Sequence, residues 1–184
     1  PGSRTGELLD MLEANEAHAS FFLLGQNIND SNGHLLQRMV EIGCEVANHS
    51  YDHPQLTVLS AEGVQEQMNL TNNLIAEKSG TQGTLMRPPY GAINDNVRAN
   101  VGMPMILWSI DTLDWKTRSA QSTIDHVMTN VRDGDIILMH DIHNATIDAS
   151  KELIPRLKEA GYQLVTVSEL APARGLSMAA GESY

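Results

Sequence analysis

The chain has 184 residues and a formal net charge of -11, and 41% of its residues are hydrophobic, which is enough for the core of one domain. The negative charge excludes a broad electrostatic attraction to nucleic acid or to anionic membranes. No apolar run approaches the roughly 20 residues that a membrane-spanning helix needs, and the single cysteine, Cys44, excludes an intramolecular disulfide.

Helical and strand-like patterns alternate from the beginning of the chain to its end. Apolar residues at helical spacing, capping residues and terminating glycines predict helices over 5–15, 33–42, 60–78, 94–100, 122–131 and 148–160. Short apolar runs between them predict strands over 19–24, 44–47, 84–86, 104–110, 135–139 and 163–167. The small and polar residues from about 173 onward are expected to fray.

This alternation indicates one α/β domain over residues 1–184. Near-continuous apolar strands separated by helices are typical of a parallel sheet that is buried on both faces. A barrel and a doubly wound sheet both fit the pattern. In either architecture, active sites collect where strands end and loops begin, and four successive expected strands are followed by polar, reactive residues.

Two histidines follow the second expected strand, in the segment His49-Ser50-Tyr51-Asp52-His53. Neutral imidazoles are common ligands of zinc and similar metals, and two of them four residues apart can face one ion. Such a metal usually takes a third ligand, commonly a carboxylate. The chain offers three candidates for it: Asp52, Asp114 and Asp141.

The next two strand ends carry an arginine and a pair of aspartates. In Arg87-Pro88-Pro89-Tyr90-Gly91 the prolines stiffen the backbone, the arginine can pair with a carboxylate, and an amide near Tyr90 is free to bind an oxyanion. In Asp111-Thr112-Leu113-Asp114-Trp115 a carboxylate can orient an imidazole, and Trp115 can form the wall of a ligand site.

The fourth strand end carries Leu138-Met139-His140-Asp141. A histidine in this position is a candidate general acid, and Leu138 could line an apolar pocket for a methyl group. Taken singly, each of these segments is also typical of an ordinary surface or strand-end turn.

In this order and spacing, the four segments closely resemble the motifs of the polysaccharide deacetylase family, the NodB-like domains of carbohydrate esterase family four. The resemblance covers nearly the whole chain, and residues 111–116 and 138–143 look most like the bacterial peptidoglycan N-acetylglucosamine deacetylases. It implies a distorted parallel (β/α) barrel of about seven strands. Pro1 resembles the last residue of the family's first motif, Thr-Phe-Asp-Asp-Gly-Pro, so the first strand is expected to lie upstream of this chain.

The resemblance implies a role for each residue that matches a motif. His49 and His53 would bind the metal, normally zinc, although another divalent transition metal such as cobalt would also serve. The third ligand and the catalytic base would be the two upstream aspartates, supplied by an N-terminal segment or fragment. Asp52, Asp111 and Asp141 are therefore set aside as metal ligands.

The other implied roles concern the reacting groups. Arg87 would hold the base aspartate, and the backbone N–H of Tyr90 would bind the oxyanion. His140 would be the general acid, tuned by Asp114. Trp115 and Leu138 would shape the acetyl pocket.

The implied reaction is the hydrolytic removal of acetyl groups from N-acetylglucosamine residues of a polysaccharide, with peptidoglycan or a chitin-like polymer as the partner. A secreted or cell-surface location is implied by the resemblance alone. The alternatives are a chitooligosaccharide deacetylase, an acetylxylan esterase, and a non-catalytic glycan-binding remnant that lacks the first motif.

Overall fold

The computed structural model describes all residues from 1 to 184. Eight α-helices alternate with short strands and single helical turns. The helices are α1 (Thr5–Ala14), α2 (Gly33–Glu41), α3 (Ala61–Ser79), α4 (Asp95–Asn100), α5 (Asp114–Thr117), α6 (Ala120–Asn130), α7 (Asn144–Glu159) and α8 (Val167–Ala173). The strands are β1 (Ser20–Leu23), β2 (Glu45–Asn48), β3 (Ile110–Asp111) and β4 (Ile137–Leu138).

All the strand pairings are parallel, as the sequence predicts. β1 pairs with β2, and β3 pairs with β4. Parallel bridges from Asn48 to Met86 and from Met86 to Met105 connect the two pairs. The succession therefore runs from β1 through β2, Met86 and the segment 105–111 to β4, which is the arrangement of a distorted barrel with helices around it.

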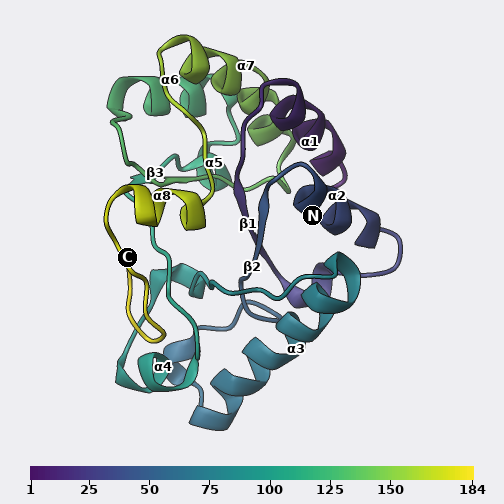
Figure 1. Ribbon diagram of the computed structural model, residues 1–184, viewed down its shortest axis with the longest axis vertical. Helices are drawn as coiled ribbons and strands as arrows, with labels where there is room; N and C mark the ends of the chain where they lie inside the picture. Colours follow the sequence, from purple (N-terminus) through teal and green to yellow (C-terminus); the bar gives the residue numbers. More distant parts are fainter.

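The helices cover this succession from several sides (Figure 1). α1, α2 and α3 pack with β1 and β2 in one cluster of buried apolar residues, and α6 and α7 form another. Ser60 begins α3 by accepting a hydrogen bond from the Gly63 amide, and Gly80 ends it in a left-handed conformation, so both signals in the sequence are used. None of the helices is long and apolar enough to cross a membrane.

Two predictions at the end of the chain are wrong. Residues 163–167 form no strand; the Leu164 carbonyl accepts one hydrogen bond from the His18 amide, and α8 begins at Val167 behind a capping box of Thr166 and Glu169. The last residues do not fray. Ser183 bridges to Met105 in parallel, and this pairing fixes the tail.

Two further strands are shorter than predicted. Residues 84–86 and 104–110 contribute single bridges at Met86 and Met105, and a regular ladder begins only at Ile110. Each of these two segments pairs with its neighbours at a single residue, so neither forms a regular strand there.

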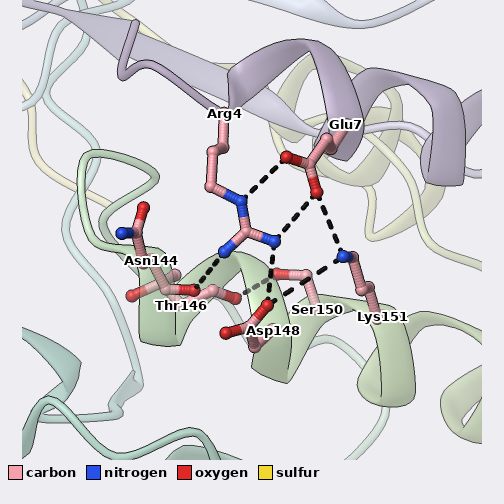
Figure 2. Close-up of polar contacts among 7 residues, drawn as sticks. All are labelled: Arg4, Glu7, Asn144, Thr146, Asp148, Ser150 and Lys151. Carbon is pink, nitrogen blue, oxygen red and sulfur yellow. Dashed lines mark hydrogen bonds and ion pairs between the residues drawn. The ribbon is translucent and has the colours of Figure 1, made fainter.

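An ion-pair network fastens the beginning of the chain to α7 (Figure 2). The Arg4 guanidinium binds Glu7 of α1 through two hydrogen bonds of 2.8 Å and Asp148 of α7 at 2.9 Å, and Lys151 reaches Glu7 at 3.0 Å. Beside it, the Thr5 hydroxyl donates to the Asp141 carboxylate. The first turn of the chain is therefore held against the loop that follows β4.

Candidate active site

One large cleft, of about 990 Å³, opens beside β1 and β4. Apolar side chains from β1, β4, α7 and the segment 163–165 line its inner part. The ends of four strand segments meet at its mouth, as the sequence predicts. Seven of the eight candidate site residues line this cleft: His49, His53, Arg87, Tyr90, Trp115, Leu138 and His140. The eighth, Asp114, lies buried behind His140.

The two histidines after β2 form a pair. Their ring centroids are 4.9 Å apart, with the planes at 68°. Nδ1 of His49 lies 2.7 Å from the Arg87 carbonyl oxygen, which can only accept, so Nδ1 carries the proton and Nε2 is free to bind a ligand. Burial lowers the pKa of His49 to about 4 and also lowers that of His53, so both rings are neutral near pH 7.

Asn48, which the sequence analysis did not single out, organises this histidine loop. Its side chain is fully buried; Oδ1 accepts from the Ser50 amide at 2.7 Å, and Nδ2 donates to the Met68 carbonyl at 3.0 Å and to Asn72 Oδ1 at 2.9 Å. Ser50 in turn accepts a hydrogen bond from the His53 amide at 3.1 Å. The sequence does carry a signal for this role, because Asn48 is a polar residue at the end of an apolar strand, directly before His49.

Arg87 is a buried cation without a carboxylate partner. Only 7% of its surface is exposed, and its guanidinium donates to the carbonyls of Ile106 at 3.1 Å and Leu107 at 2.9 Å. The guanidinium carbon also lies 4.1 Å from the centroid of the Phe22 ring. Burial lowers the pKa of Arg87 to about 10, since nothing negative offsets the lost hydration. This charge is costly unless a counter-ion reaches it from the cleft.

The backbone at the mouth of the cleft is held in an uncommon conformation. Six residues other than glycine have a positive φ, and five of them lie in the site loops: Ser50, His53, Tyr90, Leu113 and Arg118. Such residues cluster at functional sites, where the surrounding structure imposes the conformation. At Tyr90, with φ 61°, the backbone N–H has no acceptor within the chain.

His140 and Asp114 form a tightly bonded pair. Nδ1 of His140 lies 2.7 Å from Oδ1 of Asp114, and the His140 amide and the Thr146 hydroxyl each donate to Oδ2 at 2.7 Å. Burial alone would raise the pKa of Asp114, but the hydrogen bonds from His140 and Thr146 outweigh it and the pKa is lowered. Asp114 is therefore an ionised carboxylate that fixes the imidazole, and Thr146 is a second contributor that the sequence analysis missed.

Apolar side chains border the imidazoles. Leu138 is buried, whereas Trp115 is 47% exposed and Ile142 56% exposed. Large exposed apolar groups beside a polar pocket are typical of a surface that binds a ligand.

The donors present fit part of a metal site. His49 and His53 offer two neutral imidazoles with a fixed tautomer at the first, which suits zinc or a similar ion. No group of three or more His, Cys, Asp or Glu side chains in the chain could hold a metal. Asp52 accepts from Gln67 and Asp141 from Thr5, so these carboxylates are engaged elsewhere.

The polysaccharide deacetylase family model matches residues 1–104. The chain is 45% identical over 166 residues to the peptidoglycan-N-acetylmuramic acid deacetylase PdaC of Bacillus subtilis, covering 90% of this chain and 35% of that protein. It is 42% identical over 168 residues to the peptidoglycan-N-acetylglucosamine deacetylase PgdA of Listeria monocytogenes, covering 91% and 36%. The chain thus spans about a third of the length of these two relatives.

Solved structures give the same result for the fold. A deacetylase solved with its substrate superposes with a TM-score of 0.94 and 37% identity, covering 100% of this chain and 91% of that one. A family 4 acetyl xylan esterase from Clostridium thermocellum, in complex with cobalt, superposes with a TM-score of 0.93 and 30% identity, covering 99% and 91%. The predicted α/β barrel fold is confirmed.

Proposed function

The chain belongs to the polysaccharide deacetylase family, and from this premise we propose that it carries a metal-dependent site that hydrolyses the N-acetyl groups of a polysaccharide, foremost peptidoglycan. One observation carries the proposal. A pair of neutral imidazoles, His49 and His53, and a third imidazole held by a carboxylate, His140 with Asp114, converge on a single cleft. Amide hydrolysis needs an electrophilic centre and a proton donor for the amine, and this arrangement can supply both.

His49 and His53 would hold a divalent transition metal, zinc or cobalt. The neutral rings and the free Nε2 of His49 support this role, and a cobalt ion is bound in the related acetyl xylan esterase. Such a metal, when bound, polarises a carbonyl and lowers the pKa of water. Asn48 and Ser50 would keep the histidine loop in the binding conformation.

His140 would act as the general acid. Its Nδ1 is bonded to Asp114, so Nε2 is the nitrogen available to the cleft. A proton on Nε2 would pass to the amine nitrogen as the C–N bond breaks, because an amide is a poor leaving group unless it is protonated. Asp114 would orient the ring and stabilise its charged form while the proton is held.

The remaining site residues would position the acetyl group. The unpaired backbone N–H of Tyr90 could donate to the oxyanion that develops on the carbonyl oxygen. Trp115 and Leu138 would enclose the methyl group. The positions of these three residues around the cleft support the proposed roles.

The base and the third metal ligand would be carboxylates supplied by a further segment or fragment. Two features support this part of the proposal. Arg87 is buried without a carboxylate, and no third ligand stands beside the two histidines. An extended segment that carries carboxylates into the cleft would pair with the guanidinium and complete the site. Arg87 would then hold the base aspartate charged and oriented.

The polymer is proposed from the relatives. The two curated relatives above act on peptidoglycan by name, which favours a bacterial cell-wall substrate and a secreted or cell-surface location. Chitin oligomers are an alternative substrate within the same chemistry. Acetylated xylan is favoured by the likeness to the acetyl xylan esterase.

Acetate release tests the proposal. The protein, as this chain and with the upstream segment of its natural sequence restored, is incubated with peptidoglycan, N-acetylglucosamine oligomers and acetylated xylan, each with zinc and with a chelator. Zinc-dependent release that is highest on peptidoglycan is the expected result. The rate should rise when the upstream segment is present, because the base and third ligand are then supplied.

A second candidate is a non-catalytic glycan-binding domain. The observation in its favour is that the chain contains no three-residue metal group. In that case, both forms of the protein would bind the oligomers, and neither would release acetate under any metal.

A further inference from the structure

The Arg118 guanidinium lies beside His143, which lines the cleft, and has no carboxylate partner. The chain has twelve Lys and Arg residues and a net charge of -11. Seven of these cations form ion pairs: Arg4, Arg38, Lys78, Arg98, Lys151, Arg156 and Arg174. Two of the five others, Lys116 and Arg118, lie on the short segment that also carries Trp115. Neither of these two cations forms an ion pair with the Asp111 or Asp114 carboxylate of the same segment.

Arg118 is held in place by neutral acceptors. Its Nε donates to the Trp115 carbonyl at 2.7 Å, and Nη1 lies 2.9 Å from Nδ1 of His143. Its backbone has a φ of 49° and ends α5 with a hydrogen bond to the Asp114 carbonyl at 3.1 Å. Both contacts leave the charge uncompensated, and Nη2 remains available on an exposed side chain.

His143 behaves as an acceptor for this guanidinium. Desolvation and the positive charge of Arg118 lower the pKa of His143, so its Nδ1 can accept the hydrogen bond near pH 7. The His143 ring also lies 6.1 Å from the ring of His140. Arg118 therefore sits one side chain away from the proposed general acid.

The carboxylates in the neighbouring loops are engaged with other donors. Asp111 accepts from the Leu113 amide at 2.9 Å, Asp114 from His140 at 2.7 Å, and Asp141 from the Thr5 hydroxyl. None of them forms an ion pair with Arg118. An oriented guanidinium of this kind is suited to a carboxylate brought by the ligand, because its free Nη2 can donate a charge-assisted hydrogen bond to a carboxylate oxygen.

The geometry points to Arg118 as a specificity-determining residue that binds a carboxylate on the glycan, next to the sugar whose acetyl group reacts. This inference rests on the proposed function and deepens it, because it assigns anionic rather than neutral N-acetylated glycans to the site. His143 acts as a positioning residue that fixes the guanidinium.

The test compares two matched ligands by calorimetry. One is an N-acetylated glucosamine oligosaccharide with a carboxylate-bearing ether on one sugar, and the other is the same compound with that carboxylate converted to the amide. The wild-type chain should bind the carboxylate form roughly three- to tenfold more tightly, as for a partly exposed charge-assisted pair. Raising the salt from about 0.1 M to about 1 M should reduce this ratio, because the Debye length falls from roughly 10 Å to 3 Å.

The variants separate a specific contact from general charge. Arg118→Gln should bring the ratio close to one, and Arg118→Lys should restore part of it. Lys158→Gln is the matched control; it removes a half-buried cation without an ion pair, at the end of α7 far from the site, and should leave the ratio unchanged. Thermal unfolding of each variant checks that the fold is retained.

Each outcome is decisive. A wild-type chain with no preference, no binding of either ligand, or a full preference in Arg118→Gln overturns the inference. Because binding is measured without turnover, a preserved preference without acetate release supports the anion site while contradicting the proposed reaction. Acetate release without any preference between the two ligands supports the proposed reaction and contradicts the anion site.

Discussion

The carboxylate of Asp114 receives both the ring Nδ1 and the backbone amide of His140, each at 2.7 Å. The contact with Oδ1 fixes the orientation of the imidazole ring. The contact with Oδ2 fixes the backbone that carries the ring. Asp114 is 1% exposed, so solvent cannot replace these contacts. Substitution of Asp114 should therefore lower both the rate of acetate release and the stability of the fold.

Asp114→Asn should lower the rate of acetate release by roughly 10²- to 10⁴-fold, the range for loss of a correctly oriented general acid. The neutral amide can no longer accept from every donor that faces it or stabilise a charged imidazole. Steady-state kinetics on an N-acetylglucosamine oligomer checks the rate. Asp111→Asn is the control, since Asp111 accepts only from the Leu113 amide, and its rate should stay within about threefold of wild type.

Metal binding should separate the two kinds of histidine. His49→Ala should lower the bound zinc strongly, whereas His140→Ala should leave it unchanged, because His140 is bonded to Asp114 and not to the histidine pair. Zinc content after dialysis, measured by atomic emission, gives the comparison. Equal loss in both variants would show that the proposed division of roles is wrong.

Asn48→Ala should weaken both the fold and the metal site. The substitution leaves the Ser50 amide and the Met68 carbonyl without their buried partner, which costs about 1–3 kcal/mol in the free energy of unfolding. Loss of an orienting contact behind a ligand typically lowers metal affinity by about 10- to 100-fold. Urea unfolding and a zinc competition assay test the two parts. Asn130→Ala, whose side chain bonds only the exposed His126 carbonyl, is the control and should change neither.

Low pH should weaken the ion pairs that connect α1 to α7. Hydrogen bonds from Arg4 and Lys151 lower the pKa of Glu7 from 4.5 to about 2. A carboxylate with a lowered folded-state pKa stabilises the fold above its ordinary pKa, and this contribution is lost as the pH falls from 4.5 through about 2. Glu7 is 45% exposed, so screening by solvent keeps the effect small.

In the Glu7→Gln variant, the free energy of unfolding should therefore decrease less steeply as the pH falls over this range. Urea unfolding at successive pH values measures it. Glu159→Gln is the control, because Glu159 lies at the end of α7 without an ion pair and should leave the slope unchanged. An unaltered slope in Glu7→Gln would mean that the network of Figure 2 contributes nothing to acid stability.

Much of the fold follows from local signals in the sequence. Ser60 and Gly80 bound α3, and the reactive residues stand at strand ends that the parallel arrangement brings to one mouth. The apolar run at 163–167 predicts a strand, but Thr166 and Glu169 have the spacing of a capping box and begin a helix instead. That local helix signal prevailed over the strand pattern.

The parts that could not be predicted depend on contacts between distant segments. Thr146 reaches Asp114 across 32 positions, and Ser183 pairs with Met105 although the tail lacks any strand pattern of its own. No periodicity or spacing encodes such partners; they are set by packing. The roles proposed for the site residues rest in the same way on how the folded chain brings them together.

The backbone at His53 is left-handed, with a φ of 64°, so selection for stability and selection for function favour different residues at this position. For a residue with a side chain this conformation costs of order 1 kcal/mol or more, and glycine would relieve it. Glycine would also remove the imidazole. Laboratory evolution under selection for thermal stability alone is therefore expected to replace His53. Selection for turnover is expected to keep the histidine together with the less stable loop conformation.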